Sequence, residues 1–110
     1  MSTLSTHVLD AGTGTPAAGM PVALEQRAEA GGGWTPLGRG TTDGDGRVRD
    51  LSPEPLEPGV YRLVFDTDSW AAGAPAFYPE VCIVFRVTEE RHHHVPLLLS
   101  PFAYSTYRGS

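Results

Sequence analysis

Hydrophobic and polar residues alternate with a period of two in several short segments of the chain. Residues 60–66 show the pattern most clearly, because Tyr61, Leu63 and Phe65 fall on one face and Arg62 on the other. This alternation is typical of a strand that is buried on one side. The same pattern predicts further strands over residues 4–10, 21–26, 34–41, 81–88 and 92–99 and within the last ten residues, PFAYSTYRGS.

Turn-forming residues separate these segments. We expect the strands over 4–10 and 21–26 to be hairpin neighbours, because only AGTGTPAAG and one Met lie between them. The segment DTDSWAAGA offers Asp66 or Asp68 as an N-cap, followed by good helix formers. It predicts one or two helical turns, the only helix we expect.

Two Asp-Gly pairs in TTDGDGR suit a tight turn, and Arg47 should emerge just after it. Pro96 removes one backbone donor from the segment 92–99 and indicates a strand edge or an interface. About seven or eight short strands with one short helix indicate an all-β sandwich.

Composition agrees with this fold class. The chain has 110 residues, which fits a single domain over residues 1–110. Glycine (13) and proline (10) recur throughout, which argues against long helices. No stretch approaches the ~20 apolar residues of a membrane-spanning helix.

The charge balance excludes several function classes. The formal net charge is −5, which argues against nucleic acid as a partner because that binding needs a basic surface. All 8 basic residues are arginine, so Schiff-base catalysis by lysine is excluded. Cys82 is the single cysteine, and the first residues lack a signal-peptide pattern, so we expect a cytoplasmic protein.

Three short motifs carry little chemistry. Gly12-x-Gly14-x-x-Ala17 resembles a dinucleotide fingerprint, but no helix follows it. Asp43-x-Asp45 begins like a calcium loop but lacks the later ligands, so we interpret it as a hairpin turn. Cys82 lies in a predicted strand without a nearby cationic partner, so nucleophilic catalysis has little support.

The histidines are more informative. In an extended strand His92 and His94 point to one face, about 6.5–7 Å apart, and His93 points to the other. Two imidazoles on one face could bind zinc or transfer protons. His7 is the only further histidine, and no Cys-x-x-Cys or His-Glu-x-x-His pattern supports a metal site. We therefore predict no metal and keep a zinc-binding module as an alternative.

A resemblance extends over nearly the whole chain. It rests on His7, on the TTDGDGR turn with Arg47, on the His92-His93-His94-Val95-Pro96 segment and on the terminal Tyr107-Arg108-Gly109-Ser110. Together these resemble the 5-hydroxyisourate hydrolase family, the enzymatic relatives of transthyretin. The ending YRGS is the most specific of these motifs.

The resemblance implies a transthyretin-like sandwich of two four-stranded sheets. It also implies a homotetramer, assembled as a dimer of dimers, with active sites in a channel between subunits. The implied reaction follows urate oxidase in purine breakdown and opens the ring of 5-hydroxyisourate by hydrolysis. The product is 2-oxo-4-hydroxy-4-carboxy-5-ureidoimidazoline, and no cofactor is expected. The alternative is a carrier of hydrophobic small molecules that performs no chemistry.

The resemblance also implies which residues act. The implied catalytic residues are His7, Arg47, His94 and Ser110. The implied substrate-binding residues are His7, Arg47 and Tyr107. His92 and Arg108 are expected to contact these residues and not the substrate itself.

The residue types suit this chemistry. A histidine with a pKa near ~6.5 can take a proton from water, and either His7 or His94 could do so. A guanidinium can stabilise the oxyanion that forms and hold an oxygen-rich ring, which fits Arg47. Tyr107 can pack on a flat ring, and Ser110 adds a hydroxyl and the terminal carboxylate.

Overall fold

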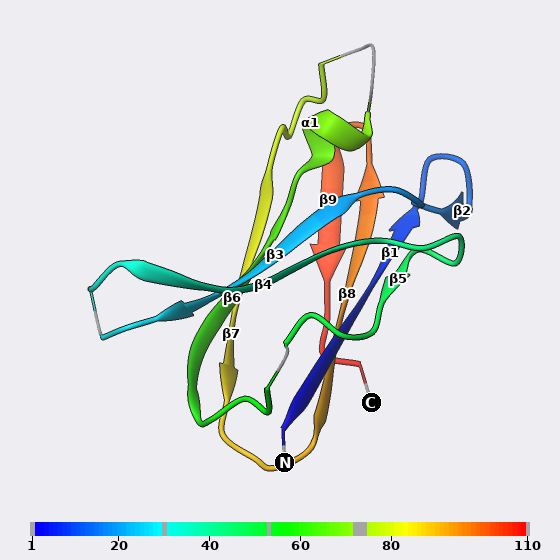
Figure 1. Ribbon diagram of the computed structural model, residues 1–110. Coiled ribbons are helices and arrows are strands. Elements are labelled where there is room, and N and C mark those ends of the chain that lie inside the picture. The colour runs from blue at the N-terminus through cyan, green and yellow to red at the C-terminus, as the bar shows by residue number, and fades with distance from the viewer. Residues whose placement is uncertain (1, 30, 53, 72–74, 110) are drawn as a thin grey trace.

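The computed structural model describes residues 2–29, 31–52, 54–71 and 75–109, which form two packed β-sheets (Figure 1). In chain order the elements are β1 (Thr3–Asp10), β2 (Thr15–Pro16), β3 (Pro21–Arg27), β4 (Trp34–Thr41), β5 (Arg47–Val48), β6 (Gly59–Phe65), α1 (Thr67–Trp70), β7 (Val81–Val87), β8 (His92–Ser100) and β9 (Ala103–Thr106). The predicted all-β class with one short helix is confirmed. No described helix has the length and apolar character needed to cross a membrane.

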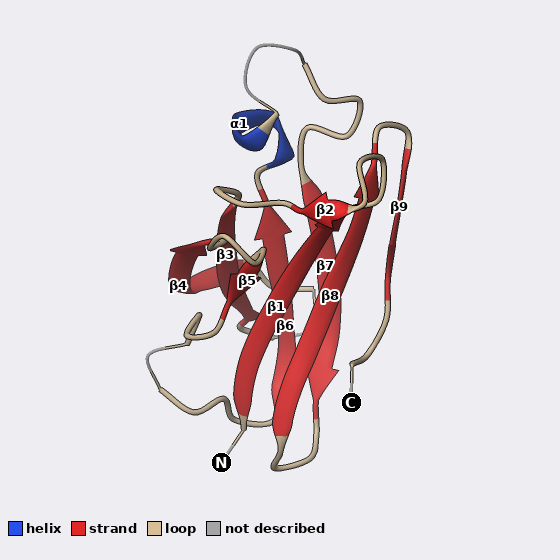
Figure 2. Ribbon diagram, turned by 90° about the vertical axis from the view of Figure 1, so that its right-hand side faces the viewer, coloured by secondary structure: helices blue, strands red, loops and turns tan. Residues whose placement is uncertain are grey.

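One sheet contains β1, β8 and β9, together with the two short segments β2 and β5. Both short segments pair with the same edge of β1: β2 lies opposite Leu9 and Asp10, and β5 lies opposite Thr6 and His7 (Figure 2). The sheet is therefore four strands wide with an interrupted edge strand. The second sheet has the order β4-β3-β6-β7, so the expected pair of four-stranded sheets is confirmed.

The predicted hairpin between the first two long strands is wrong. β1 and β3 lie in different sheets, and the long partner of β1 is β8, which runs parallel to it from Thr3 opposite His92 to Asp10 opposite Leu99. Alternation identifies a strand by its buried face but carries no information about its neighbour. The parallel pairing joins residues almost a chain length apart and brings the histidine segment beside the N-terminal strand.

The core lies between the sheets and is built from every second residue of the long strands. Leu4 and Val8 of β1, Leu24 of β3, Leu63 of β6 and Leu97 of β8 are each at most 2% exposed. Burying side chains of this size stabilises the fold by roughly 1.5–3 kcal/mol each. The alternate residues of β1 and β8 consequently face outward on a rigid sheet.

The sequence signals for the short helix and for Pro96 have different outcomes. Asp66 caps α1, because its carboxylate accepts bonds from the Ser69 amide at 3.1 Å and hydroxyl at 2.7 Å. Pro96 lies in β8 between β1 and β9, so the predicted strand edge is wrong, and the alternative that Pro96 marks an interface stays a prediction. Along β8 the proline lies between His94, which forms a bridge with Gly109, and Leu97, which pairs with Thr106 of β9.

Candidate active site

The histidines of β8 take the predicted orientations. His93 is 8% exposed and belongs to the inner face, whereas His92 and His94 lie on the outer face of the sheet. The parallel register places Thr3 beside His92 and Ser5 beside His94. Two imidazoles of one strand and two hydroxyls of its neighbour therefore share one surface.

Arg47 reaches this surface through the turn that precedes it. The Asp43 carboxylate accepts the Arg47 amide at 3.0 Å, and this bond is the main reason that the pKa of Asp43 is lowered. Gly46 has a φ of 76°, and a Cβ there would lie 2.5 Å from the Val8 carbonyl oxygen, so the turn requires glycine. The chain then pairs Arg47 with His7 of β1. The predicted position of Arg47 directly after the turn is confirmed.

Hydrogen bonds join the two outer histidines. The Oγ1 atom of Thr3 lies 2.6 Å from Nδ1 of His92, and Oγ of Ser5 lies 2.7 Å from Nε2 of the same ring. The Ser5 hydroxyl also lies 2.8 Å from Nδ1 of His94. Both nitrogens of His92 are thus engaged, whereas Nε2 of His94 has no partner among the described residues.

An open cavity of about 420 Å³ lies over these groups. Its lining residues are Ser5, Thr6, Arg47, Arg49, His92 and His94. This lining contains two arginines and no carboxylate, although the whole chain carries a net charge of −5. A local concentration of positive charge favours an anionic or oxygen-rich ligand at this position.

The pKa of His94 is lowered below its ordinary value. Burial is the largest cause, followed by the positive charges of Arg47, His7 and His92, and the Ser5 backbone acts in the opposite direction. The lowered pKa favours the neutral ring, and its Nε2 can accept a proton when the ring proton is on Nδ1. This is the state that a general base requires.

The C-terminal segment packs onto the same histidine. The amide of Gly109 donates to the His94 carbonyl oxygen at 2.8 Å, so the terminal segment holds the backbone of His94 while Ser5 of β1 bonds to its ring. Tyr107 is 60% exposed, and Nη1 of Arg108 lies 3.9 Å from a carboxylate oxygen of Glu89 at the surface. Ser110 lies outside the described residues.

The structure therefore brings Arg47, His92 and His94 together, as predicted. His7 lies opposite Arg47 in the ladder and is near enough to affect the pKa of His94, but it does not line the cavity. Tyr107 and Arg108 do not line it either, so their roles remain predictions.

The sequence did not lead us to expect Thr3, Ser5 and Arg49 at the site. The period-2 pattern places Ser5 on the face of His7, and Arg49 follows Arg47 by two residues, so both carried a signal. Their contact with the histidines depends on the pairing of β1 with β8, which the pattern does not specify. No group of three or more metal-ligating side chains is present among the described residues.

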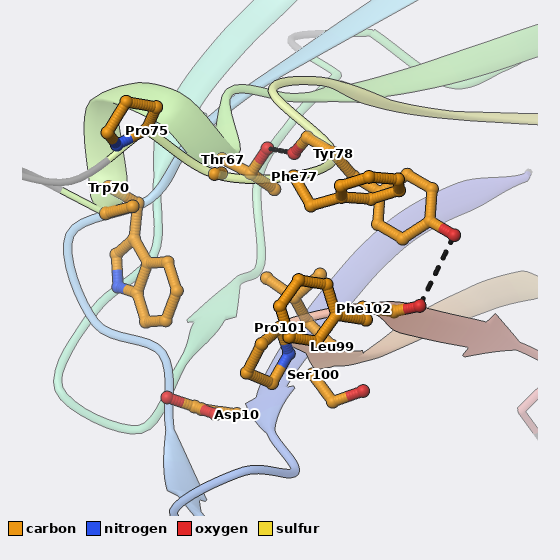
Figure 3. Close-up of a pocket in the computed structure, with 12 residues that line it drawn as sticks. Asp10, Thr67, Trp70, Pro75, Phe77, Tyr78, Leu99, Ser100, Pro101 and Phe102 are labelled. Carbon is orange, nitrogen blue, oxygen red and sulfur yellow. Dashed lines mark hydrogen bonds between the residues drawn. The ribbon is translucent and has the colours of Figure 1, made fainter.

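A second cavity, of about 270 Å³, lies beside α1 (Figure 3). Trp70, Phe77 and Phe102 give it an aromatic wall, and Asp10 lies at its lower rim. Asp10 already accepts bonds from the amides of Gly12 and Thr13, and no imidazole or guanidinium lines the cavity. The groups needed for acid–base chemistry are at the histidine cavity instead.

Comparisons with known proteins agree with the fold. The chain is 47% identical to the 5-hydroxyisourate hydrolase of Salmonella dublin, over 97% of this chain and 80% of that protein. The solved structure of the Klebsiella pneumoniae 5-hydroxyisourate hydrolase is 40% identical and superimposes over 100% of both chains with a TM-score of 0.87. Transthyretin from Sparus aurata is 36% identical, with a TM-score of 0.86 over 97% of this chain and 96% of that one. Residues 4–109 match the HIUase/Transthyretin family, and the chain belongs to that family.

Proposed function

We propose that this protein is a hydrolase that opens the ring of 5-hydroxyisourate in urate degradation. One observation carries the proposal: His94, whose Nε2 has no partner among the described residues and whose pKa is lowered, shares with Arg47 a cavity without carboxylates. The similarity to hydrolases of Salmonella dublin and Klebsiella pneumoniae over nearly the whole chain supports the choice of substrate.

The proposed reaction uses His94 as the base. Nε2 of His94 takes a proton from water while the water oxygen attacks the ring carbonyl carbon. Negative charge develops on the carbonyl oxygen, where the Arg47 guanidinium stabilises it. The ring C–N bond then breaks, the nitrogen takes up a proton, and the new carboxyl group ionises.

We assign the remaining groups to substrate binding. His7 lies in register with Arg47 and can hold the far side of the ring. Tyr107 is exposed two residues before Gly109 and can cover the ring face. We keep Ser110, which follows Gly109 in the sequence, as a proposed catalytic group. Arg49 also lines the cavity and adds positive charge.

We further propose that the protein assembles as a homotetramer, a dimer of dimers. β9 forms one edge of the first sheet and β7 forms one edge of the second, and Phe102 (75% exposed) and Val84 (57%) leave large apolar groups uncovered. A second copy could pair with these edges. Light scattering during size-exclusion chromatography tests this: the mass of four chains supports the proposal, and a monomer at micromolar concentration contradicts it.

The carrier alternative is tested by measuring two properties of one sample. 5-Hydroxyisourate generated by urate oxidase is followed by its ultraviolet decay with and without the protein, and binding of a bulky iodinated aromatic is measured by calorimetry. Accelerated decay that is lost in His94→Asn supports the hydrolase. Tight aromatic binding without accelerated decay supports the carrier.

A further inference from the structure

Ser5 connects the two outer histidines through a single hydroxyl group. Its Oγ atom lies 2.7 Å from Nε2 of His92 and 2.8 Å from Nδ1 of His94. A hydroxyl has one proton and two lone pairs, so it can donate to only one of the two rings, and it accepts from the other ring or from both. Whenever Ser5 donates to one of these imidazole nitrogens, the facing nitrogen of the other ring must therefore carry a proton.

Two arrangements use the Ser5 proton in one of these hydrogen bonds. In the first, Nδ1–H of His94 donates to Ser5 and Ser5 donates to Nε2 of His92, which leaves Nε2 of His94 with a free lone pair. In the second, Nε2–H of His92 donates to Ser5 and Ser5 donates to Nδ1 of His94, so that the proton of a neutral His94 is on its Nε2. The first arrangement makes His94 a base, and the second makes it an acid.

We propose that Ser5 is a positioning residue that passes a proton between His94 and the solvent-exposed His92, and so switches His94 between its base and acid forms. The inference rests on the proposed hydrolysis and deepens it. Thr3 completes the chain, because its hydroxyl lies 2.6 Å from the remaining ring nitrogen of His92.

One passage moves protons along the line from His94 through Ser5 to His92. Nε2 of His94 gains a proton from water, and its Nδ1 proton moves to Oγ of Ser5. The original Ser5 proton moves to Nε2 of His92, which becomes a cation or releases its Nδ1 proton through Thr3 to solvent. Ser5 itself ends neutral, with one proton as before.

The charges around the site favour this transfer. His94 is partly buried and is near Arg47 of β5, His7 of β1 and His92 of its own strand, all of which disfavour a cation on His94. Arg49, which follows β5, lines the same cavity. His92 is exposed, so water can solvate a positive charge there. Movement of the proton to His92 therefore removes positive charge from His94, which lies among other basic side chains.

The test compares Ser5→Ala with Ser5→Thr, and Ser100→Ala is the matched control. Ser100 lies on the same sheet and donates to the Ala103 carbonyl oxygen at 3.0 Å, so its loss removes one similar hydrogen bond away from the histidines. We expect Ser5→Ala to lower kcat by about 10–100-fold with little change in KM, the usual scale for a group that orients a reacting residue. Ser5→Thr keeps the hydroxyl and should recover most of the rate, and Ser100→Ala should match the wild type.

A proton inventory separates a relay from a structural role. When kcat is plotted against the deuterium fraction of the solvent, the wild type should give a curved line, because several protons move together. Ser5→Ala should give a straight line. An unchanged curve in Ser5→Ala overturns the relay even if kcat falls. If Ser5→Ala does not fold, His92→Gln takes its place with the same expectations.

Nitrogen-15 NMR of the imidazoles tests the coupling without substrate. In the wild type the tautomers of His92 and His94 should change together as pH varies, and in Ser5→Ala they should titrate independently. Independent titration in the wild type overturns the proposal. Because this readout needs no turnover, an inactive wild type would count against the proposed function and leave the relay to be decided by NMR.

Discussion

Gly109 packs directly against the imidazole ring of His94. A Cβ atom at position 109 would lie 2.7 Å from Cδ2 of His94 and 3.1 Å from its Cβ. The Gly109 amide also donates to the His94 carbonyl oxygen. The terminal segment therefore has a geometric role at the site, because its glycine leaves room for the ring that the proposed reaction uses.

Gly109→Ala should therefore displace the His94 ring and lower kcat by about 10–100-fold, the scale of a displaced supporting contact. The measurement is the rate of 5-hydroxyisourate decay. Gly33→Ala is the matched control, because a Cβ there meets nothing within 4 Å. Equal activity of the two variants would show that the ring position is not critical.

Arg47→Lys keeps the charge but loses the planar fork of the guanidinium. We expect kcat/KM to fall by about 10²–10³-fold if Arg47 stabilises the oxyanion. The melting temperature should hardly change, because Arg47 is exposed. Arg86→Lys, on the outer face of β7, is the control and should retain full activity; near-normal turnover in Arg47→Lys would remove Arg47 from the reaction.

The lowered pKa of His94 sets the pH dependence. A base must be neutral, so kcat/KM should rise with pH with a midpoint below the ordinary histidine pKa of about 6.5. His94→Asn should abolish this rise of kcat/KM with pH. Replacement of the neighbouring charge in Arg47→Gln should raise the pKa of His94, as measured by NMR titration. If the rise with pH persists in His94→Asn, His7 is the base instead.

The same pKa affects stability. Because folding lowers the pKa of His94, the unfolded chain binds more protons between the folded and unfolded pKa values. This group therefore destabilises the fold as pH falls through that window and has no such effect above it. Denaturant titrations at several pH values should show a shallower acid slope in His94→Asn than in the wild type.

Removal of residues 107–110 should abolish hydrolysis and leave the sandwich folded. β9 ends at Thr106, and its ladder from Leu97–Thr106 to Ser100–Ala103 remains after the deletion. The far-ultraviolet circular dichroism spectrum and the melting temperature report the fold, and substrate decay reports the site. A truncated protein with full activity would show that YRGS is not part of the site.

Much of this arrangement could be predicted from the sequence, because period-2 alternation reports local burial. It placed Tyr61 and Leu63 in the core and His92 and His94 on the opposite side from His93, as observed. The Asp-Gly turn likewise predicted where Arg47 emerges, because a turn depends on neighbouring residues alone.

Strand partners could not be predicted in the same way, because pairing depends on contacts between distant residues. The assumed hairpin of β1 with β3 was wrong for this reason. The pairing of Ser5 with His94, which links hydroxyl and imidazole across 89 positions of sequence, was not foreseen. The role of the Ser5 hydroxyl in joining His92 and His94 follows only from the pairing of β1 with β8.

The most direct test of the central claim is multiple turnover. A trace of protein is added to an excess of freshly generated 5-hydroxyisourate, and the ultraviolet decay is compared with the spontaneous rate. We expect each chain to convert many substrate molecules, and we expect His94→Asn and Arg47→Lys to lose nearly all of this acceleration. Decay at the spontaneous rate in the presence of folded wild-type protein would contradict the claim.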